Sequence, residues 1–195
     1  MITLVRHGQT AANRGGLLQG RADVPLTDLG HHQAALVAAG IQAAPARVLA
    51  SPLRRAADTA APIAERFGLE VEIDERLVEL DYGEWDQRSI GDVTPEEWRR
   101  WRHDSSFAPP GGESLEDVAA RTASFCSEML GTEGGVVAVS HVSPIKAGVA
   151  WALGSGAGVT WHLLLDLASV TRVARRPDGR ACLASFNETG HLRVD

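Results

Sequence analysis

Two histidines in this sequence directly follow apolar runs that have the composition of buried strands. His7 comes after residues 2–5, with Arg6 between, and His141 comes after residues 136–139, with Ser140 between. A neutral imidazole is a competent nucleophile near pH 7, and a neighbouring guanidinium can bind a phosphoryl oxygen with two hydrogen bonds while balancing its charge. Arg6 and His7 are therefore residue types suited to phosphoryl transfer.

Further side chains that favour an anion are predicted near the same strand ends. Gly8 lets the backbone approach a phosphate closely, and Asn13 adds a neutral donor in the loop after the first strand. Arg54 stands in the first turn of a helix expected after a Ser-Pro pair, where free amide groups favour an anion. His141 is another donor. Glu79 precedes an irregular segment and is the candidate proton donor to a leaving oxygen.

The elements that must position these residues alternate between short apolar runs and longer amphipathic ones. Such alternation predicts an α/β fold, a three-layer sandwich with a mainly parallel central sheet, in which ligands bind beyond the carboxyl ends of the strands. The pattern predicts strands at residues 2–5, 47–50, 69–73 and 136–139, helices at about 28–39, 52–67, 113–130 and 144–153, and short edge strands at 163–165, 170–174 and 182–186.

The length of 195 residues predicts a single domain over residues 1–195. Between about residues 77 and 112 the periodicity breaks down and glycine and proline are frequent, which indicates a lid-like insertion lying over a site. A short helix is expected within it near residues 95–103. Its aromatic residues form either the wall of an apolar pocket or the core of the insertion: Trp85, Trp98, Trp101 and Phe107.

Composition excludes several classes of protein. The net charge of −6 argues against a nucleic-acid binder with a basic surface, so the basic, aromatic stretch at residues 98–103 is interpreted as an amphipathic helix. No apolar run has the length of a membrane span. The two cysteines, Cys126 and Cys182, suggest neither a disulfide scaffold nor a zinc site. Without an N-terminal secretory signal, a cytoplasmic location is expected.

Several motifs then follow one another in an order that resembles the histidine phosphatase superfamily, the phosphoglycerate-mutase-like proteins, in its phosphatase branch. They span nearly the whole chain, and together they are far more specific than the Arg-His-Gly tripeptide alone. The motifs are residues 4–10 with Asn13, Gln19-Gly20, Leu26-Thr27 with Gly30, residues 51–60, residues 79–85, residues 110–114 and residues 139–141.

This resemblance implies a phosphatase that hydrolyses phosphate monoesters without a metal or another cofactor. Carried over residue by residue, it implies that His7 is phosphorylated, that Arg6, Arg54 and His141 surround the phosphoryl group, and that Glu79 acts first as acid and then as base. It also implies a phosphate- and substrate-binding set that comprises Arg6, Asn13, Gln19, Gly20, Arg54, His141 and Val142. Val142 stands where the family often has glycine.

Several assignments have alternatives. The motif register favours Arg54 and leaves Arg55 as a solvated helix residue or an ion-pair partner. Glu79 competes with three other carboxylates that would otherwise form a solvated edge: Asp81, Glu84 and Asp86.

A cofactor-dependent phosphoglycerate mutase shares the same site residues, and a catalytically silent module that binds a phosphorylated ligand is a third hypothesis. The expected partner is a small phosphorylated substrate, with no nucleic acid and no membrane, and a homodimer is left open.

Overall fold

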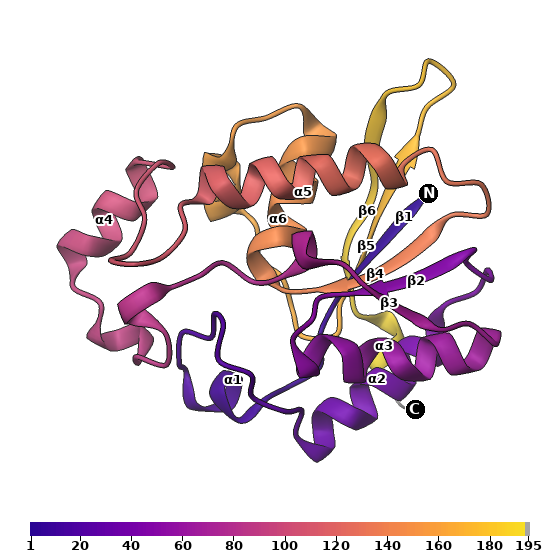
Figure 1. The fold of residues 1–195 in the computed structure, drawn as a ribbon, viewed down its shortest axis with the longest axis horizontal. Helices are drawn as coiled ribbons and strands as arrows, with labels where there is room; N and C mark the ends of the chain where they lie inside the picture. The colour runs from indigo at the N-terminus through magenta and orange to yellow at the C-terminus, as the bar shows by residue number, and fades with distance from the viewer. Residues whose placement is uncertain (194–195) are drawn as a thin grey trace.

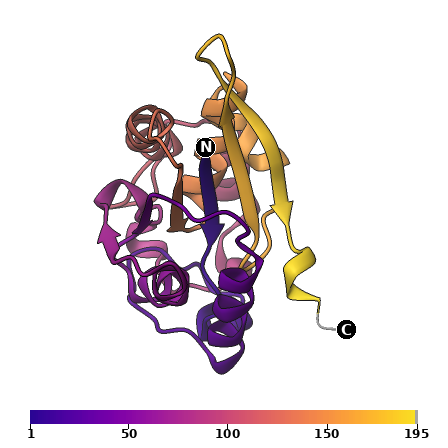
Figure 2. The same cartoon turned by 90° about the vertical axis from the view of Figure 1, so that its right-hand side faces the viewer.

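A single mixed sheet forms the centre of the computed structural model, which describes residues 1–193 (Figure 1). Its six strands lie in the order β3-β2-β4-β1-β5-β6. The parallel strands are β1 (Ile2–Arg6), β2 (Arg47–Ala50), β3 (Val71–Ile73) and β4 (Val136–Ser140). The antiparallel strands β5 (Val170–Arg175) and β6 (Ala181–Glu188) complete one edge beside β1 (Figure 2). The expected three-layer, mainly parallel architecture is confirmed.

Helices cover both faces of this sheet (Figure 1). On one face α2 (Asp28–Gly40) and α3 (Arg54–Phe67) bury Val37 and Ile63 against Val48 and Val139. On the other face α5 (Leu115–Met129) and α6 (Val142–Leu153) bury Phe125 and Ile145 against Leu4 and Ala138. β1 and β4 are buried on both faces, because they occupy the middle of the sheet.

The segment after β3 carries its own small core. It contains the short 3₁₀ turns η1 (Glu75–Leu77), η2 (Gly83–Trp85) and η3 (Ile90–Asp92), followed by α4 (Pro95–His103). Trp85 and Trp101 are buried there against Leu80 and Leu115. Figure 1 shows α4 beyond the carboxyl ends of β1 and β4. The helix expected near residues 95–103 is confirmed, and it starts with a capping box between Thr94 and Glu97.

Two local predictions differ from the structure. Residues 163–165 form no strand; they follow the 3₁₀ helix η4 (Ala157–His162), and the Leu165 carbonyl accepts a hydrogen bond from Arg6 instead of from a neighbouring strand. The loop after β1 contains a short helix, α1 (Ala11–Gly15), which the pattern did not predict. Its capping box between Thr10 and Asn13 supplies the hydrogen bonds that so short a helix lacks.

The ends of the longer helices are stabilised by local capping interactions. The Thr27 hydroxyl accepts a hydrogen bond from the Gly30 amide at the start of α2, and Ser114 forms a capping box with Asp117 at the start of α5. Gly154 ends α6 in the left-handed conformation. No helix within residues 1–193 combines the length and the apolar character needed to cross a membrane.

Candidate active site

The two histidines meet at the carboxyl ends of neighbouring strands. Arg6 of β1 pairs with Ser140 of β4, so the residues that follow, His7 and His141, leave the sheet side by side. Their ring centroids are 5.0 Å apart, and both side chains are buried. The expected proximity of the two imidazoles is thus a direct consequence of parallel register.

The hydrogen bond of His7 defines which ring nitrogen is free. Nδ1 lies 2.7 Å from the carbonyl oxygen of Gly8, which can only accept, so Nδ1 carries the hydrogen and Nε2 keeps its lone pair. Burial lowers the pKa of His7 well below 6.5, and the charges of Arg6 and Arg55 lower it further. The ring is therefore neutral near pH 7 and has Nε2 available as a nucleophile.

His141 has the opposite tautomer. Its Nδ1 accepts a hydrogen bond from Nε of Arg55 at 3.2 Å, so Nε2 carries the hydrogen and donates to Oγ of Ser51 at 2.7 Å. Burial lowers the pKa of His141 well below 6.5, and Arg55 and His7 add to the effect. Both rings are neutral, which leaves the guanidinium groups as the charged partners for an anion.

The arginine beside His141 is Arg55. The motif register favoured Arg54 for this position, and that prediction is wrong. The Arg54 side chain is exposed, and its backbone amide donates to Asp23. Arg55 is completely buried, and its guanidinium donates to the carbonyls of Gly20 and Ala22, each at 2.8 Å, besides His141. Burial lowers the pKa of Arg55 from its ordinary value, but a guanidinium remains charged in a protein.

Two polar groups that line the cleft keep unused donors. Arg6 donates through Nη1 to the Leu165 carbonyl, whereas its buried Nε has no partner among the described residues. Gln19 accepts from the Thr10 hydroxyl through Oε1 at 2.7 Å, and its buried Nε2 is likewise unpaired within residues 1–193. Buried donors are normally satisfied, so these two nitrogens are suited to a ligand oxygen. Asn13 lines the same cleft.

Glu79 is held at the amino terminus of α6, the helix that begins directly after His141. Its Oε2 accepts from the amide of Val142 at 3.1 Å, and Oε1 accepts from the amides of Ser143 at 3.2 Å and Leu80 at 2.7 Å. The side chain is 4 % exposed and lines the cleft with Arg6 and His7. This arrangement fixes a carboxyl group near the candidate nucleophile.

Two of the three competing carboxylates, Asp81 and Asp86, have other partners. Asp86 accepts the amides of Gly20, Arg21 and Ala22, and Asp81 accepts that of Gly83. Neither they nor Glu84 lines the cleft that holds His7. Of the four candidate carboxylates, Glu79 is the one that lines the cleft with His7.

Glycines and Val142 have structural tasks at this site. A Cβ on Gly8 would collide with the carbonyl oxygen of Gly30, so Gly8 permits close packing of the loop on α2 rather than an approach to a ligand. A Cβ on Gly20 would lie 2.8 Å from the carbonyl oxygen of Leu80, and the Gly20 carbonyl orients Arg55. Val142 lines the cleft, and its amide is already used by Glu79.

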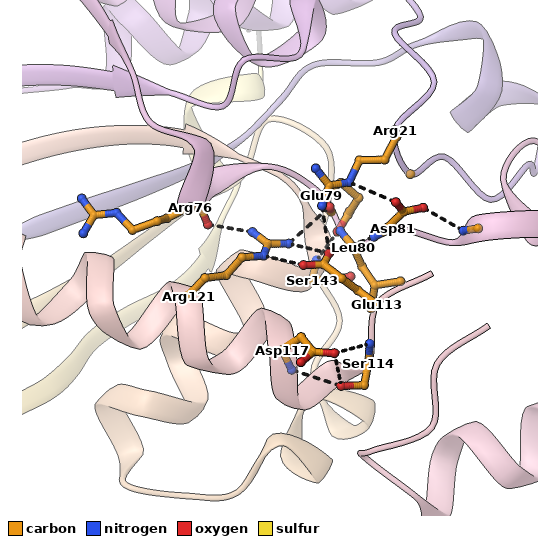
Figure 3. A network of polar contacts seen from close by, with 12 residues as sticks. Arg21, Arg76, Glu79, Leu80, Asp81, Glu113, Ser114, Asp117, Arg121 and Ser143 are labelled. Atoms are coloured by element: carbon orange, nitrogen blue, oxygen red, sulfur yellow. Dashed lines mark hydrogen bonds and ion pairs between the residues drawn. The ribbon is translucent and has the colours of Figure 1, made fainter. Parts of the chain in front are cut away.

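A network behind Glu79 supports its backbone (Figure 3). Arg121 of α5 donates to the carbonyl oxygen of Glu79 at 3.3 Å and contacts Glu113 at 3.1 Å. Glu113 in turn accepts from the amide of Asp81 at 3.0 Å and from Arg21 at 3.0 Å. Both sides of the Glu79 segment are therefore tied to α5 and to the loop that carries Arg21.

The cleft lined by Arg6, His7 and Glu79 has a volume of about 580 Å³. Lys146, the single lysine of the chain, lines it and has no carboxylate within ion-pair distance among residues 1–193. Burial lowers the pKa of Lys146, as does the charge of Arg6. Motif spacing did not identify Lys146 or Arg55. Within the described residues no cluster of three or more His, Cys, Asp or Glu side chains could hold a metal ion.

Fold and site together define a class of α/β proteins with paired histidines at the ends of two parallel strands. The model of the histidine phosphatase superfamily (branch 1) matches residues 2–188, and the chain belongs to this family.

Two curated relatives come from Mycobacterium tuberculosis. A bifunctional protein is 38% identical over 98% of this chain and 54% of its own length, and a glucosyl-3-phosphoglycerate phosphatase is 35% identical over 84% of each chain. This chain thus spans about half the length of the first of these relatives.

Solved structures show the same fold. A mycobacterial glucosyl-3-phosphoglycerate phosphatase, solved with vanadate, superposes with a TM-score of 0.88 at 34% identity, covering 96% of this chain and 99% of the other. A phosphoserine phosphatase of Entamoeba histolytica, solved with 3-phosphoglyceric acid, superposes with a TM-score of 0.90 at 28% identity, covering 98% of each chain.

Proposed function

We propose that this protein is a metal-independent phosphatase that hydrolyses small phosphate monoesters through a phosphohistidine on His7. The observation that carries the proposal is the free Nε2 of a neutral His7 in a cleft that also holds the guanidinium of Arg6 and the carboxyl of Glu79. A nucleophile, a cation for the transferred oxygens and a proton donor are the three groups that such a displacement needs.

The first step transfers the phosphoryl group to the protein. Nε2 of His7 attacks phosphorus as the P–O bond to the alcohol breaks, and the protonated carboxyl of Glu79 gives its proton to the departing oxygen. Arg6 and Arg55 balance the charge on the three remaining phosphoryl oxygens, and His141 keeps the guanidinium of Arg55 in place by accepting a hydrogen bond from its Nε. Water then attacks the phosphohistidine, Glu79 recovers a proton from it, and inorganic phosphate and a neutral His7 remain.

The curated and structural relatives support a small phosphorylated substrate. They include phosphatases named for glucosyl-3-phosphoglycerate and for phosphoserine. The cleft here is large enough for molecules of that size, and its donors are positioned for one phosphate group. Partners of another kind, nucleic acid or membrane, have no support in the site. The cytoplasmic location and the homodimer left open by the sequence stay predictions.

We further assign residues 1–195 to one domain, with residues 77–112 as its lid. Ile90 and Trp98 of this segment line the cleft, which supports a covering role.

Phosphoglycerate mutase is the second candidate, because it uses the same residues. A mutase must keep water from the phosphohistidine until the group returns to a phosphoglycerate. The segment over this cleft is short, so water reaches the site readily. Incubation with 3-phosphoglycerate and a catalytic amount of the bisphosphorylated primer should therefore yield inorganic phosphate and little 2-phosphoglycerate. Efficient interconversion without phosphate release would identify a mutase.

The direct test is isolation of the labelled intermediate. After brief reaction with a monoester and an acid-free quench, mass spectrometry should place the phosphoryl group on His7. Turnover should survive excess EDTA and vanish in His7→Ala, which also tests the hypothesis of a silent binding module. A label on another residue, wild-type turnover in His7→Ala, or activity that depends on an added metal would contradict the mechanism.

A further inference from the structure

A second, smaller pocket opens beside the cleft. Its volume is about 110 Å³, and it is lined by the face of α4 that carries Trp98 and Trp101 and by the turn η4. The pocket and the cleft share five wall residues, so a ligand bound at His7 can extend directly from one into the other. The shared residues are Leu18, Tyr82, Trp98, Val142 and Lys146.

Three tryptophans give this pocket flat, apolar walls. The rings of Trp98 and Trp101 are stacked at 5.4 Å between centroids, and Trp161 meets Trp101 edge-on at 4.9 Å. Trp101 is 3 % exposed, and Leu115 closes the pocket from α5. Because the three rings pack on one another, the shape of the pocket is largely preformed, which favours a rigid guest.

Polar groups that could bind sugar hydroxyls are scarce there. The Thr160 hydroxyl already donates to the Ala157 carbonyl at 2.7 Å, and the Ser143 amide is used by Glu79. Among the residues that line this pocket, Trp101 has a buried donor, Nε1, without a partner in the described chain. The remaining polar side chains of the pocket are those of Tyr82, Ser143 and Lys146, and Tyr82 and Lys146 stand on the wall shared with the cleft. A sugar placed against the tryptophans would therefore leave hydroxyls without hydrogen bonds, at a cost of about 1–3 kcal/mol each.

We propose that this pocket binds a flat apolar ring carried by the alcohol part of the substrate. This rests on the proposed function, and it narrows the substrate to phosphate monoesters with a ring a few bonds from the phosphate. A dry cavity of roughly 150 Å³ can hold benzene. This pocket of about 110 Å³ is smaller, so a single ring would fill it and extend into the adjoining cleft. Nε1 of Trp101 supplies one donor for an acceptor atom of that ring.

The test compares two substrates with the same leaving group chemistry. In 3-phenylpropyl phosphate and propyl phosphate the departing oxygen is bonded to the same kind of carbon, so the chemical step is equally difficult. Burial of one phenyl ring should raise kcat/KM for the first substrate by roughly 10- to 100-fold. A ratio near one, or a preference for phosphoserine over the ring substrate, would overturn the assignment.

Matched variants locate the effect. Leu115→Phe fills the pocket and should bring the ratio of the two kcat/KM values close to one. Leu164→Phe makes the same substitution at a side chain that is 84 % exposed and should keep the wild-type ratio. Equal ratios in the two variants would show that the ring binds elsewhere. Since each ratio is taken within one variant, a partial loss of folded protein does not alter it.

Binding of phosphonates separates this inference from the proposed function. A phosphonate has a carbon–phosphorus bond in place of the ester, so its affinity does not depend on turnover. By calorimetry the wild-type protein should bind 3-phenylpropylphosphonate at least 10-fold more tightly than propylphosphonate. Tighter binding of the phenyl phosphonate without hydrolysis of either ester would refute the proposed phosphatase activity and support the ring pocket. Equal affinity for the two phosphonates together with hydrolysis of the esters would support the phosphatase activity and refute the ring pocket.

Discussion

Replacement of Arg55 by lysine should damage both stability and turnover, whereas Arg54→Lys should change neither. The two arginines are adjacent on α3, yet Arg55 is completely buried and Arg54 is exposed. The guanidinium of Arg55 uses three different nitrogens for Gly20, Ala22 and His141. Lysine retains the positive charge but has one nitrogen, which cannot occupy three separated positions.

The magnitude follows from these contacts. Hydrogen bonds from a charged donor contribute about 1.5–3 kcal/mol each, so the loss of two of the three costs roughly 3–6 kcal/mol. Water that reaches the Ala22 carbonyl recovers a part, because that bond is only partly buried. We expect the free energy of unfolding to fall by about 3 kcal/mol, which most domains survive. Loss of the guanidinium beside the phosphate should lower kcat by about 10²- to 10³-fold.

Urea unfolding and phosphate release from a simple monoester measure the two effects. The exposed Arg54→Lys variant should stay within about 0.5 kcal/mol of the wild type and within twofold in kcat. If Arg54→Lys proves the more damaging substitution, or if Arg55→Lys keeps wild-type turnover, the placement of Arg55 beside the transferred phosphate is refuted.

Three further predictions concern Glu79, its support and the histidines. Glu79→Gln should slow hydrolysis of alkyl phosphates far more than that of nitrophenyl phosphate, because a nitrophenolate leaves without a proton; equal losses would remove Glu79 from the acid role. Arg121→Met removes the contacts of Arg121 with the Glu79 carbonyl and with Glu113. It should lower kcat about 10-fold and leave KM little changed, and the loss of kcat should be larger for alkyl than for aryl esters. The control Arg99→Met, at an exposed side chain, should have no effect. An equal loss for both ester types would show that Arg121 does not act through Glu79. The pKa values of His7 and His141 are lowered in the folded state. As pH falls below about 6.5, these two rings therefore take up protons only in the unfolded chain. The free energy of unfolding should then decrease by up to about 1.4 kcal/mol per pH unit for each ring. Chemical denaturation between pH 5 and 8 measures this slope, and His7→Asn should make it shallower; a slope unchanged in that variant would contradict the lowered pKa of His7.

The sequence was most informative where a pattern depends on local physics. The apolar runs at residues 2–5 and 136–139 predicted two buried strands, β1 and β4, and parallel pairing of these strands brings His7 and His141 together. The placement of Glu79 followed from its family motif, and its three amide contacts could not be predicted because they depend on how α6 meets the inserted segment.

To choose between Arg54 and Arg55, one needs to know which face of α3 is buried. Arg55 lies one turn from Thr59, which is buried, and Thr59 accepts from the Gly8 amide and donates to the Arg55 carbonyl. Arg54 lies one turn from Asp58, on the solvated face. Adjacent helix residues differ by about 100° in direction, so the buried stripe of α3 could have identified Arg55. The false strand at residues 163–165 arose because alternation alone cannot show that a carbonyl will bind a distant arginine.

The pairing of β1 with β4 also determines when the site can exist during synthesis. Ile2 lies opposite Val136, and on its other side β1 pairs with β5, so the first of the six strands to be synthesised is flanked by two of the later ones. Such long-range pairing is slow and leaves an apolar strand without neighbours until they arrive. The nascent chain therefore carries His7 long before it has a partner ring. The site with both histidines and Glu79 therefore exists only after β4 and α6 have folded onto β1.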